Sequence, residues 1–313
     1  MRRAIVAVVV GGLAAFPSLG LAGRLEVSVE KAGSPVGSAL VRIYPGATSR
    51  RTLASGECAF AGLAAGTYRV VASKDISGVY NAAVNQAVTV PAHGTVTVTL
   101  RLTRAIMLNE YLPRAVGDKW YYNVVRDWPT HRETDHRSER VTGLRRVAGD
   151  MVAVVDIRWA HDHIVSLERS VAAGYGMYGE DRSGDEMRLD PPLLVENPLP
   201  RGQELHYETT AHHSSGAADE PVTLDIKLDG FDNITVPKGL FRDCARLVGT
   251  HIQGPRTSRF TIWAAEGVGI VKQIEQQGPK RVTRELAEAP PLRPVPLLRA
   301  PRGLIPGTPG RPE

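Results

Sequence analysis

The first third of the chain alternates hydrophobic and polar residues with a period of two. Leu25, Val27 and Val29 alternate with polar neighbours, and the same pattern returns at 39–44, 67–72 and 95–100. Alternation of this kind is typical of strands that bury one face, and turn residues rich in Gly, Pro and Ser separate the runs. Residues 24–103 are therefore predicted to form a small β-sandwich of about seven short strands.

Strand-like runs also recur in the region 117–289, separated by long polar turns. They lie at 120–125, 151–159, 164–167, 222–228, 259–263 and 268–274. Pro and Gly punctuate them as hairpin residues do, and a helical period is nowhere sustained. We expect an all-β chain with a second domain at 117–289, built as a curved antiparallel sheet, and a linker at 104–116.

The first domain contains a Gly-Leu-x-x-Gly-Thr-Tyr motif at 62–68, followed by Val-Thr-Val at 88–90 and 96–98. These motifs resemble the carboxypeptidase regulatory-like, transthyretin-like β-sandwich, an immunoglobulin-like arrangement of seven strands. In such a motif Gly66 permits a tight turn, and Tyr68 and Val70 return to the core. The resemblance implies an accessory module that serves for packing, for spacing or for binding, and it implies no enzyme.

Three motifs of the second domain resemble a poorly characterised class of exported bacterial proteins, many of them lipoproteins. The motifs are Tyr111-Leu112-Pro113-x-x-x-Gly117-x-x-Trp120-x-Tyr122, Ile234-Thr235-Val236-Pro237-x-Gly239-x-Phe241-x-Asp243-Cys244 and Trp263-Ala264-x-x-Gly267-Val268-Gly269-Ile270-Val271-Lys272. The fold of this class is similar to the half-barrel of LolA- and LolB-type lipoprotein carriers. The resemblance thus implies a half-barrel with a concave apolar face. Lys238 and Leu240 depart from the pattern of the class.

The sequence predicts that the two ends of the chain do not belong to a folded domain. Residues 1–22 combine Arg2 and Arg3, a short apolar stretch and small residues before Ala22, as in a cleaved secretory signal peptide. Arg24 stands where a lipid-anchor cysteine would follow, and the apolar stretch is too interrupted to span a membrane. Residues 290–313 are rich in Pro and Arg, which predicts a disordered tail. We expect a periplasmic or secreted protein that is soluble after signal cleavage.

The charge distribution argues against a nucleic-acid partner. The formal net charge is +5, of which Arg2 and Arg3 supply two charges and the tail supplies three, from four arginines against Glu313. The body between these ends therefore has no net charge. Dispersed charges of both signs give no stripe that tracks phosphates.

Candidate catalytic chemistry is sparse, so we expect no enzyme and no cofactor. The Gly-x-Ser-x-Gly sequence of a nucleophile elbow is absent. His161 and His163 are two residues apart, so on a strand both imidazoles could face one cation, but no spacing identifies a third ligand. These two histidines are weak metal candidates, and His131, His136, His212 and His213 could in principle supply a third ligand.

The two cysteines, Cys58 and Cys244, fit neither a metal knuckle nor a redox pair. One lies in each predicted domain, and the sequence leaves open whether a disulfide joins them. Cys244 lies between Arg242 and Arg246 in strand spacing, which would favour its thiolate if the sulfur is free and exposed.

The large side chains of the second-domain motifs are candidates for its core or for a ligand-binding surface. They are Trp120, Tyr122, Phe241, Trp263 and Val268. The leading hypothesis is a non-enzymatic envelope protein whose first domain acts as a spacer or as a docking module. Its curved sheet would then bind an apolar ligand, either a lipid, a hydrophobic peptide or a segment of an envelope partner. The alternatives are a structural or assembly module with a self-filled core and a metal-dependent enzyme centred on His161 and His163.

Overall fold

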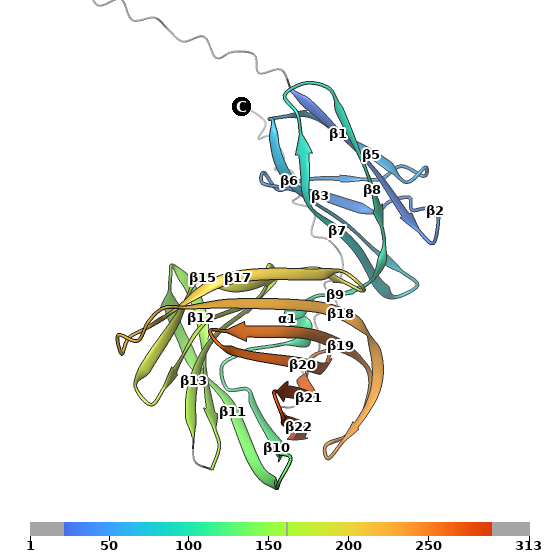
Figure 1. Ribbon diagram of the computed structural model, residues 1–313. Coiled ribbons are helices and arrows are strands. Elements are labelled where there is room, and N and C mark those ends of the chain that lie inside the picture. The colour runs from blue at the N-terminus through green and yellow to red at the C-terminus, as the bar shows by residue number, and fades with distance from the viewer. Residues whose placement is uncertain (1–21, 161, 290–313) are drawn as a thin grey trace, which may run out of the picture. The chain divides into compact units, whose positions relative to one another are not determined.

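The computed structural model describes residues 22–160 and 162–289. The predicted signal peptide up to residue 21, His161 and the predicted tail from residue 290 lie outside these ranges. The described chain is nearly all strand, as the sequence predicts (Figure 1). It divides into two compact units near residue 102, with residues 79–81 grouped with the second unit. In the described ranges no helix has the length and apolar character needed to cross a membrane.

The N-terminal unit has two sheets that contribute to one hydrophobic core. In the first sheet β1 pairs with β2, β5 and β8, and the pairing with β8 is parallel, which the sequence did not predict. The second sheet contains β7, β6, β3 and β4 in this order. Leu25 and Phe60 from the first sheet and Ile43 from the second belong to the same core. Tyr68 and Val70 are buried in it, as predicted.

The strands of this unit have the following bounds: β1 (Gly23–Lys31), β2 (Ser34–Pro35), β3 (Leu40–Tyr44), β4 (Thr48–Arg51), β5 (Glu57–Leu63), β6 (Gly66–Ile76), β7 (Val79–Val90) and β8 (Thr95–Arg101).

The second unit is a closed barrel, so the predicted half-barrel is wrong. Within the described residues twelve strands follow one another around the ring, and every neighbouring pair is antiparallel. The ring closes where β22 pairs with β10, which places Tyr122 opposite Leu286. Local alternation reports which face of a strand is buried, but it carries no signal for a pairing between strands so far apart in the chain.

The barrel strands have the following bounds: β10 (Lys119–Asp127), β11 (Arg132–Val147), β12 (Asp150–Arg158), β13 (His163–Val171), β14 (Gly174–Arg182), β15 (Asp185–Glu196), β17 (Glu204–His213), β18 (Glu220–Val236), β19 (Gly239–Gln253), β20 (Arg256–Ala265), β21 (Gly269–Gln277) and β22 (Lys280–Glu288).

One end of the barrel is closed by the segment that the sequence predicts as a linker. Here β9 (Thr103–Ile106) pairs with β16 (Leu199–Pro200), and α1 (Leu108–Tyr111) contacts β13 and β14 on one side of the ring and β21 on the other. Ile106, Leu108, Tyr111 and Leu112 share one hydrophobic cluster with residues of the barrel wall. We call residues 103–118 the plug and this end the plugged end.

Hydrogen bonds tie the plug to several parts of the barrel, as three of them illustrate. The Ser170 hydroxyl on β13 donates to the Leu112 carbonyl at 2.7 Å. The Leu108 amide donates to the Asn197 side chain at 2.7 Å, and the Gly267 amide donates to the Glu110 carbonyl at 2.7 Å. The plug is therefore fixed through polar contacts as well as apolar packing.

Candidate functional site

A cavity of about 660 Å³ lies inside the barrel. Its lining comes from β10 to β14 and from β19 to β22. Arg182, Arg256 and Gln277 line the cavity, are exposed, and stand at strand ends beside the hairpin turns that join β14 to β15, β19 to β20 and β21 to β22. The cavity therefore opens at the end of the barrel opposite the plug, which we call the open end.

The cavity lining is amphipathic, whereas the sequence-based expectation was a purely apolar face. One part of the wall, from β22 through β10 to β14, supplies all six apolar lining residues. They are Val124, Ile157, Trp159, Ile164, Met177 and Val282. The same part also carries polar and charged lining residues, namely Arg126, Arg137, Asp162, Ser166, Glu168, Glu180, Arg182, Lys280 and Arg284. The part from β19 to β21 is polar, with His251, Gln253, Arg256, Ser258, Gln273, Glu275 and Gln277. A ligand that contacts both parts needs an apolar body and polar groups.

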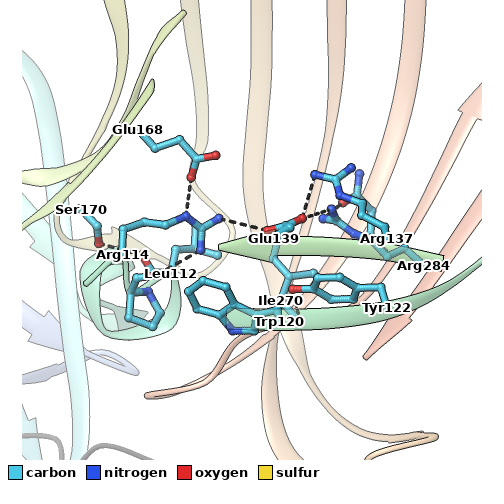
Figure 2. Close-up of polar contacts among 12 residues, drawn as sticks. Leu112, Arg114, Trp120, Tyr122, Arg137, Glu139, Glu168, Ser170, Ile270 and Arg284 are labelled. Atoms are coloured by element: carbon cyan, nitrogen blue, oxygen red, sulfur yellow. Dashed lines mark hydrogen bonds and ion pairs between the residues drawn. The ribbon is translucent and has the colours of Figure 1, made fainter. Parts of the chain in front are cut away.

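A buried ionic cluster connects the cavity to the plug (Figure 2). It consists of Arg114 from the plug and of Arg137, Glu139, Glu168 and Arg284 from the barrel. Arg137, Glu168 and Arg284 also line the cavity. The side chains of the cluster are between 3% and 20% exposed, with Arg137 the most exposed.

Three guanidinium groups share two carboxylates in this cluster. The Glu139 Oε1 atom lies 2.7 Å from Arg137 Nη2 and 2.7 Å from Arg284 Nη1. The Arg114 Nε donates to Glu168, and Arg114 Nη2 lies 3.9 Å from Glu139 Oε2. The Tyr175 hydroxyl also donates to Glu168. Both carboxylates are thus engaged by groups of the protein.

Aromatic rings lie beneath the three arginines. The guanidinium carbon of Arg284 is 4.8 Å from the centre of the Tyr122 ring, and that of Arg137 is 4.6 Å from Trp159. Arg114 is 5.1 Å from the Trp120 ring. The negative faces of such rings attract cations, which stabilises the arginines where water is largely excluded.

The charges of the cluster persist at neutral pH. Burial would raise the pKa of Glu139, but the charges of Arg137, Arg284 and Arg114 outweigh it and lower the pKa to about 2. Burial and the neighbouring Arg284 lower the pKa of Arg137 to about 10, which still leaves it protonated. With three cations and two anions, the cluster has a net charge of one positive unit.

The five ligand-binding candidates of the sequence come together in the core, next to residues that line the cavity. Trp120, Tyr122 and Val268 are buried in one hydrophobic cluster, and Phe241 and Trp263 pack against it. The Trp120 indole donates to the Val268 carbonyl at 2.7 Å, and the Tyr122 hydroxyl donates to the Ile270 carbonyl at 3.1 Å. Among the described residues that line the cavity, none is one of these five.

Of the two weak metal candidates, His163 lies within the described residues, and its local environment is ordinary. The His163 ring lies 2.7 Å from Asp156 on the neighbouring strand and is more than half exposed. Its predicted partner His161 lies outside the described residues. Across 22–160 and 162–289, no group of three or more His, Cys, Asp or Glu side chains is placed to hold a metal ion.

Both cysteines are free thiols. Cys244 is fully buried, and burial together with Asp243 and Asp232 raises its pKa to about 11, so its thiolate is disfavoured. The strand spacing that was read from Arg242 to Cys244 does not hold, because the register of β19 against β18 shifts between Phe241 and Cys244. Cys244 and the next residue, Ala245, are both buried.

The ionic cluster was missed in the sequence, although a signal for it exists. Arg137 and Glu139 are in phase with the buried Val141, and Glu168 is in phase with Ile164. Arg284 lies between Val282 and the buried Leu286 on the same face. A charged residue in phase with apolar residues on an inward-facing row indicates a buried charge, which must find partners.

Comparison with known proteins finds low similarity in both sequence and structure. No protein-family model matches the sequence, and no curated protein matches it. One similar structure is a protein assigned as a lipoprotein from Parabacteroides distasonis, 12% identical, covering 57% of this chain and 98% of its own, with a TM-score of 0.35. Another is a protein assigned as exported, with a YmcC-like fold, from Bacteroides fragilis, 10% identical, covering 58% of this chain and 99% of its own, with a TM-score of 0.30. At these TM-scores neither similarity assigns a function.

Proposed function

We propose that the protein is a non-enzymatic, exported bacterial envelope protein, periplasmic or secreted, whose barrel holds a small amphipathic ligand. The observation that carries this proposal is the cavity of about 660 Å³, whose lining is mostly polar and charged but includes apolar residues on the wall from β22 through β10 to β14. Cavities of roughly 300–1,000 Å³ are typical of small-molecule sites. The signal-like first 22 residues support export.

The polar part of the cavity favours an amphipathic ligand, such as a lipid, over the hydrophobic peptide that the sequence-based hypothesis also allowed. A hydrocarbon that filled the cavity would cover the side chains of His251, Ser258 and Glu275 without offering them hydrogen bonds. Leaving a buried polar group without a partner costs about 1–3 kcal/mol per group. A ligand with polar groups avoids this cost while its apolar body contacts Ile157 and Ile164.

For the N-terminal unit we propose the role of a carboxypeptidase regulatory-like accessory module that spaces or docks the barrel. The Gly-Leu-x-x-Gly-Thr-Tyr motif at 62–68 and the core shared by two sheets support this role. Such modules contribute surface and separation and no reaction of their own.

The cavity is tested with one variant that fills it and a matched variant that does not. Met177 lines the cavity, whereas Met151 is 48% exposed and lies outside it. We expect native mass spectrometry of the protein purified from the envelope to show a bound amphiphile, released on unfolding. Met177→Trp should weaken its binding by about tenfold or more, and Met151→Trp should leave it unchanged.

Absence of any bound or added amphiphile from the folded wild-type protein would refute the proposal. It would favour the structural or assembly module, in which the barrel is a support and its cavity holds water. Equal binding by Met177→Trp and by the wild type would show that the ligand sits elsewhere.

A further inference from the structure

We propose that Arg137 and Arg284 bind the negatively charged head group of the cavity ligand, an oxygen anion such as a carboxylate or a phosphoester. This inference rests on the proposed function, because it assigns a chemistry to one end of the same ligand. Both arginines belong to the buried ionic cluster and line the cavity.

The first argument is the charge of the cluster. Glu139 is shared by Arg137 and Arg284, while Glu168 is taken up by Arg114 and by the Tyr175 hydroxyl. One positive charge therefore has no matching carboxylate within the cluster. A buried charge without a counter-charge is costly, and a bound anion would remove that cost.

The second argument is the hydrogen-bond donors that the protein leaves unused. The Nε atoms of Arg137 and Arg284 are buried, and neither has an acceptor within the described residues. The Arg284 side chain is 9% exposed, so water reaches it poorly. Arginine donors in a planar fork match the oxygens of carboxylates and phosphates in geometry and charge.

The third argument is that the other cationic lining residues have different surroundings. Arg126 lies 3.2 Å from Asp135, and Arg182 lies 3.7 Å from Asp162 and is more than half exposed. Arg256 is exposed at the open end, and the Lys280 ammonium lies 4.8 Å from the centre of the Trp128 ring. Arg137 and Arg284 instead share a single carboxylate and are close enough that Arg284 contributes to lowering the pKa of Arg137. An anion at this pair would leave the apolar body of the ligand beside the neighbouring apolar wall, with Ile157 and Val282.

The head-group preference is tested on the wild-type protein with a series of amphiphiles that share one chain length. The probes are decanoate, decyl phosphate, decyltrimethylammonium and decyl maltoside, each below its micelle concentration, measured by isothermal titration calorimetry. We expect decanoate, decyl phosphate or both to bind at least about tenfold more tightly than the cationic and neutral probes. The comparison between the two anions separates a carboxylate from a phosphoester.

The residues are tested with Arg137→Gln and with Arg146→Gln as a matched control. Arg146 lies on the same strand and is exposed, so its substitution removes the same charge without changing the cavity. Arg137→Gln should weaken binding of the anionic probe by about tenfold or more and change decyl maltoside binding by less than about twofold. Arg146→Gln should change neither.

The outcomes separate the two proposals. Equal affinity for anionic, neutral and cationic probes, or an anion affinity unchanged in folded Arg137→Gln, would overturn the head-group site and leave the cavity function standing. Binding of no probe at all would overturn both. If Arg137→Gln does not fold, the wild-type comparison of head groups still decides.

Discussion

Glu139 holds two guanidiniums with one oxygen atom, and the surrounding side chains keep water away from it. Its side chain is 3% exposed, and both Arg137 and Arg284 lie 2.7 Å from Oε1. A buried ion pair adds little net stability over an apolar pair, but removal of one partner leaves the other charge uncompensated. Glu139 is therefore the residue whose loss costs the barrel most at this cluster.

We predict that Glu139→Gln lowers the free energy of unfolding by about 3–5 kcal/mol, because two or more buried arginines lose their counter-charge. Urea unfolding followed by circular dichroism measures this loss. The control is Glu208→Gln, since the Glu208 side chain is 76% exposed, and it should change stability by less than about 0.5 kcal/mol. Similar stabilities for the two variants would show that the cluster is not held as described.

Acid should weaken the protein through the same carboxylate. The pKa of Glu139 is about 2 in the folded protein and near 4.5 in the unfolded chain. Because the pKa of Glu139 is lower in the folded protein than in the unfolded chain, the ionised carboxylate stabilises the fold fully above about pH 4.5. This stabilisation is lost as the pH falls from about 4.5 towards 2. The contribution is about 3 kcal/mol in size.

The difference in unfolding free energy between wild type and Glu139→Gln should therefore shrink as the pH falls from 5 to 2. Urea unfolding of both proteins at successive pH values between 5 and 2 measures this difference in free energy. A constant difference over the whole interval would contradict an ionised, buried Glu139.

At the scale of elements, the plug determines that the barrel has one closed and one open end. Its short helix offers little stability of its own, because a single turn leaves most backbone groups without intrahelical bonds. The plug is kept in place by its apolar side chains and by bonds from Ser170, Asn197 and Gly267.

We predict that Leu108→Ala lowers the free energy of unfolding by about 2–5 kcal/mol, because it leaves a cavity where a 1% exposed side chain fills the barrel end. The matched control is Leu240→Ala, at a residue that is 55% exposed, with an expected change below about 0.5 kcal/mol. Thermal and urea unfolding of both variants test the prediction. An equally small effect in Leu108→Ala would mean that the plug does not support the barrel.

Six of the barrel strands could be predicted from the sequence, because apolar residues recur along them. β12, β13, β18, β20 and β21 are of this kind, as is β10 with Trp120 and Tyr122. β11 was missed, since its inward row includes Arg137 and Glu139 and its outer row is also charged. A polar interior removes the contrast on which strand prediction depends.

The sequence predicted the candidate site less well than it predicted the fold. The motif aromatics pointed to the correct domain, but Trp120 and Tyr122 support the arginines from the core and do not line the cavity. Arg114 and Glu168 are 54 residues apart in sequence and meet only through the closed ring. Contacts of this kind follow from tertiary structure and have no local pattern.

At the scale of the whole molecule, the hydrophobic clusters divide as the two units do. One cluster contains only residues between Leu25 and Leu102, and the remaining clusters contain only residues from Ile106 onward. Each unit thus has a core of its own, which is the usual criterion for a separate domain.

The pairing of β10 with β22 also determines when the barrel can be finished. The last partner of the ring is the last strand to leave the ribosome or the export channel, so a nascent chain that ends before Lys280 has an open sheet with bare edges at β10 and β21. Exposed edges of this kind recruit strands from other molecules. A chain truncated before Lys280 should therefore aggregate more readily than the full chain.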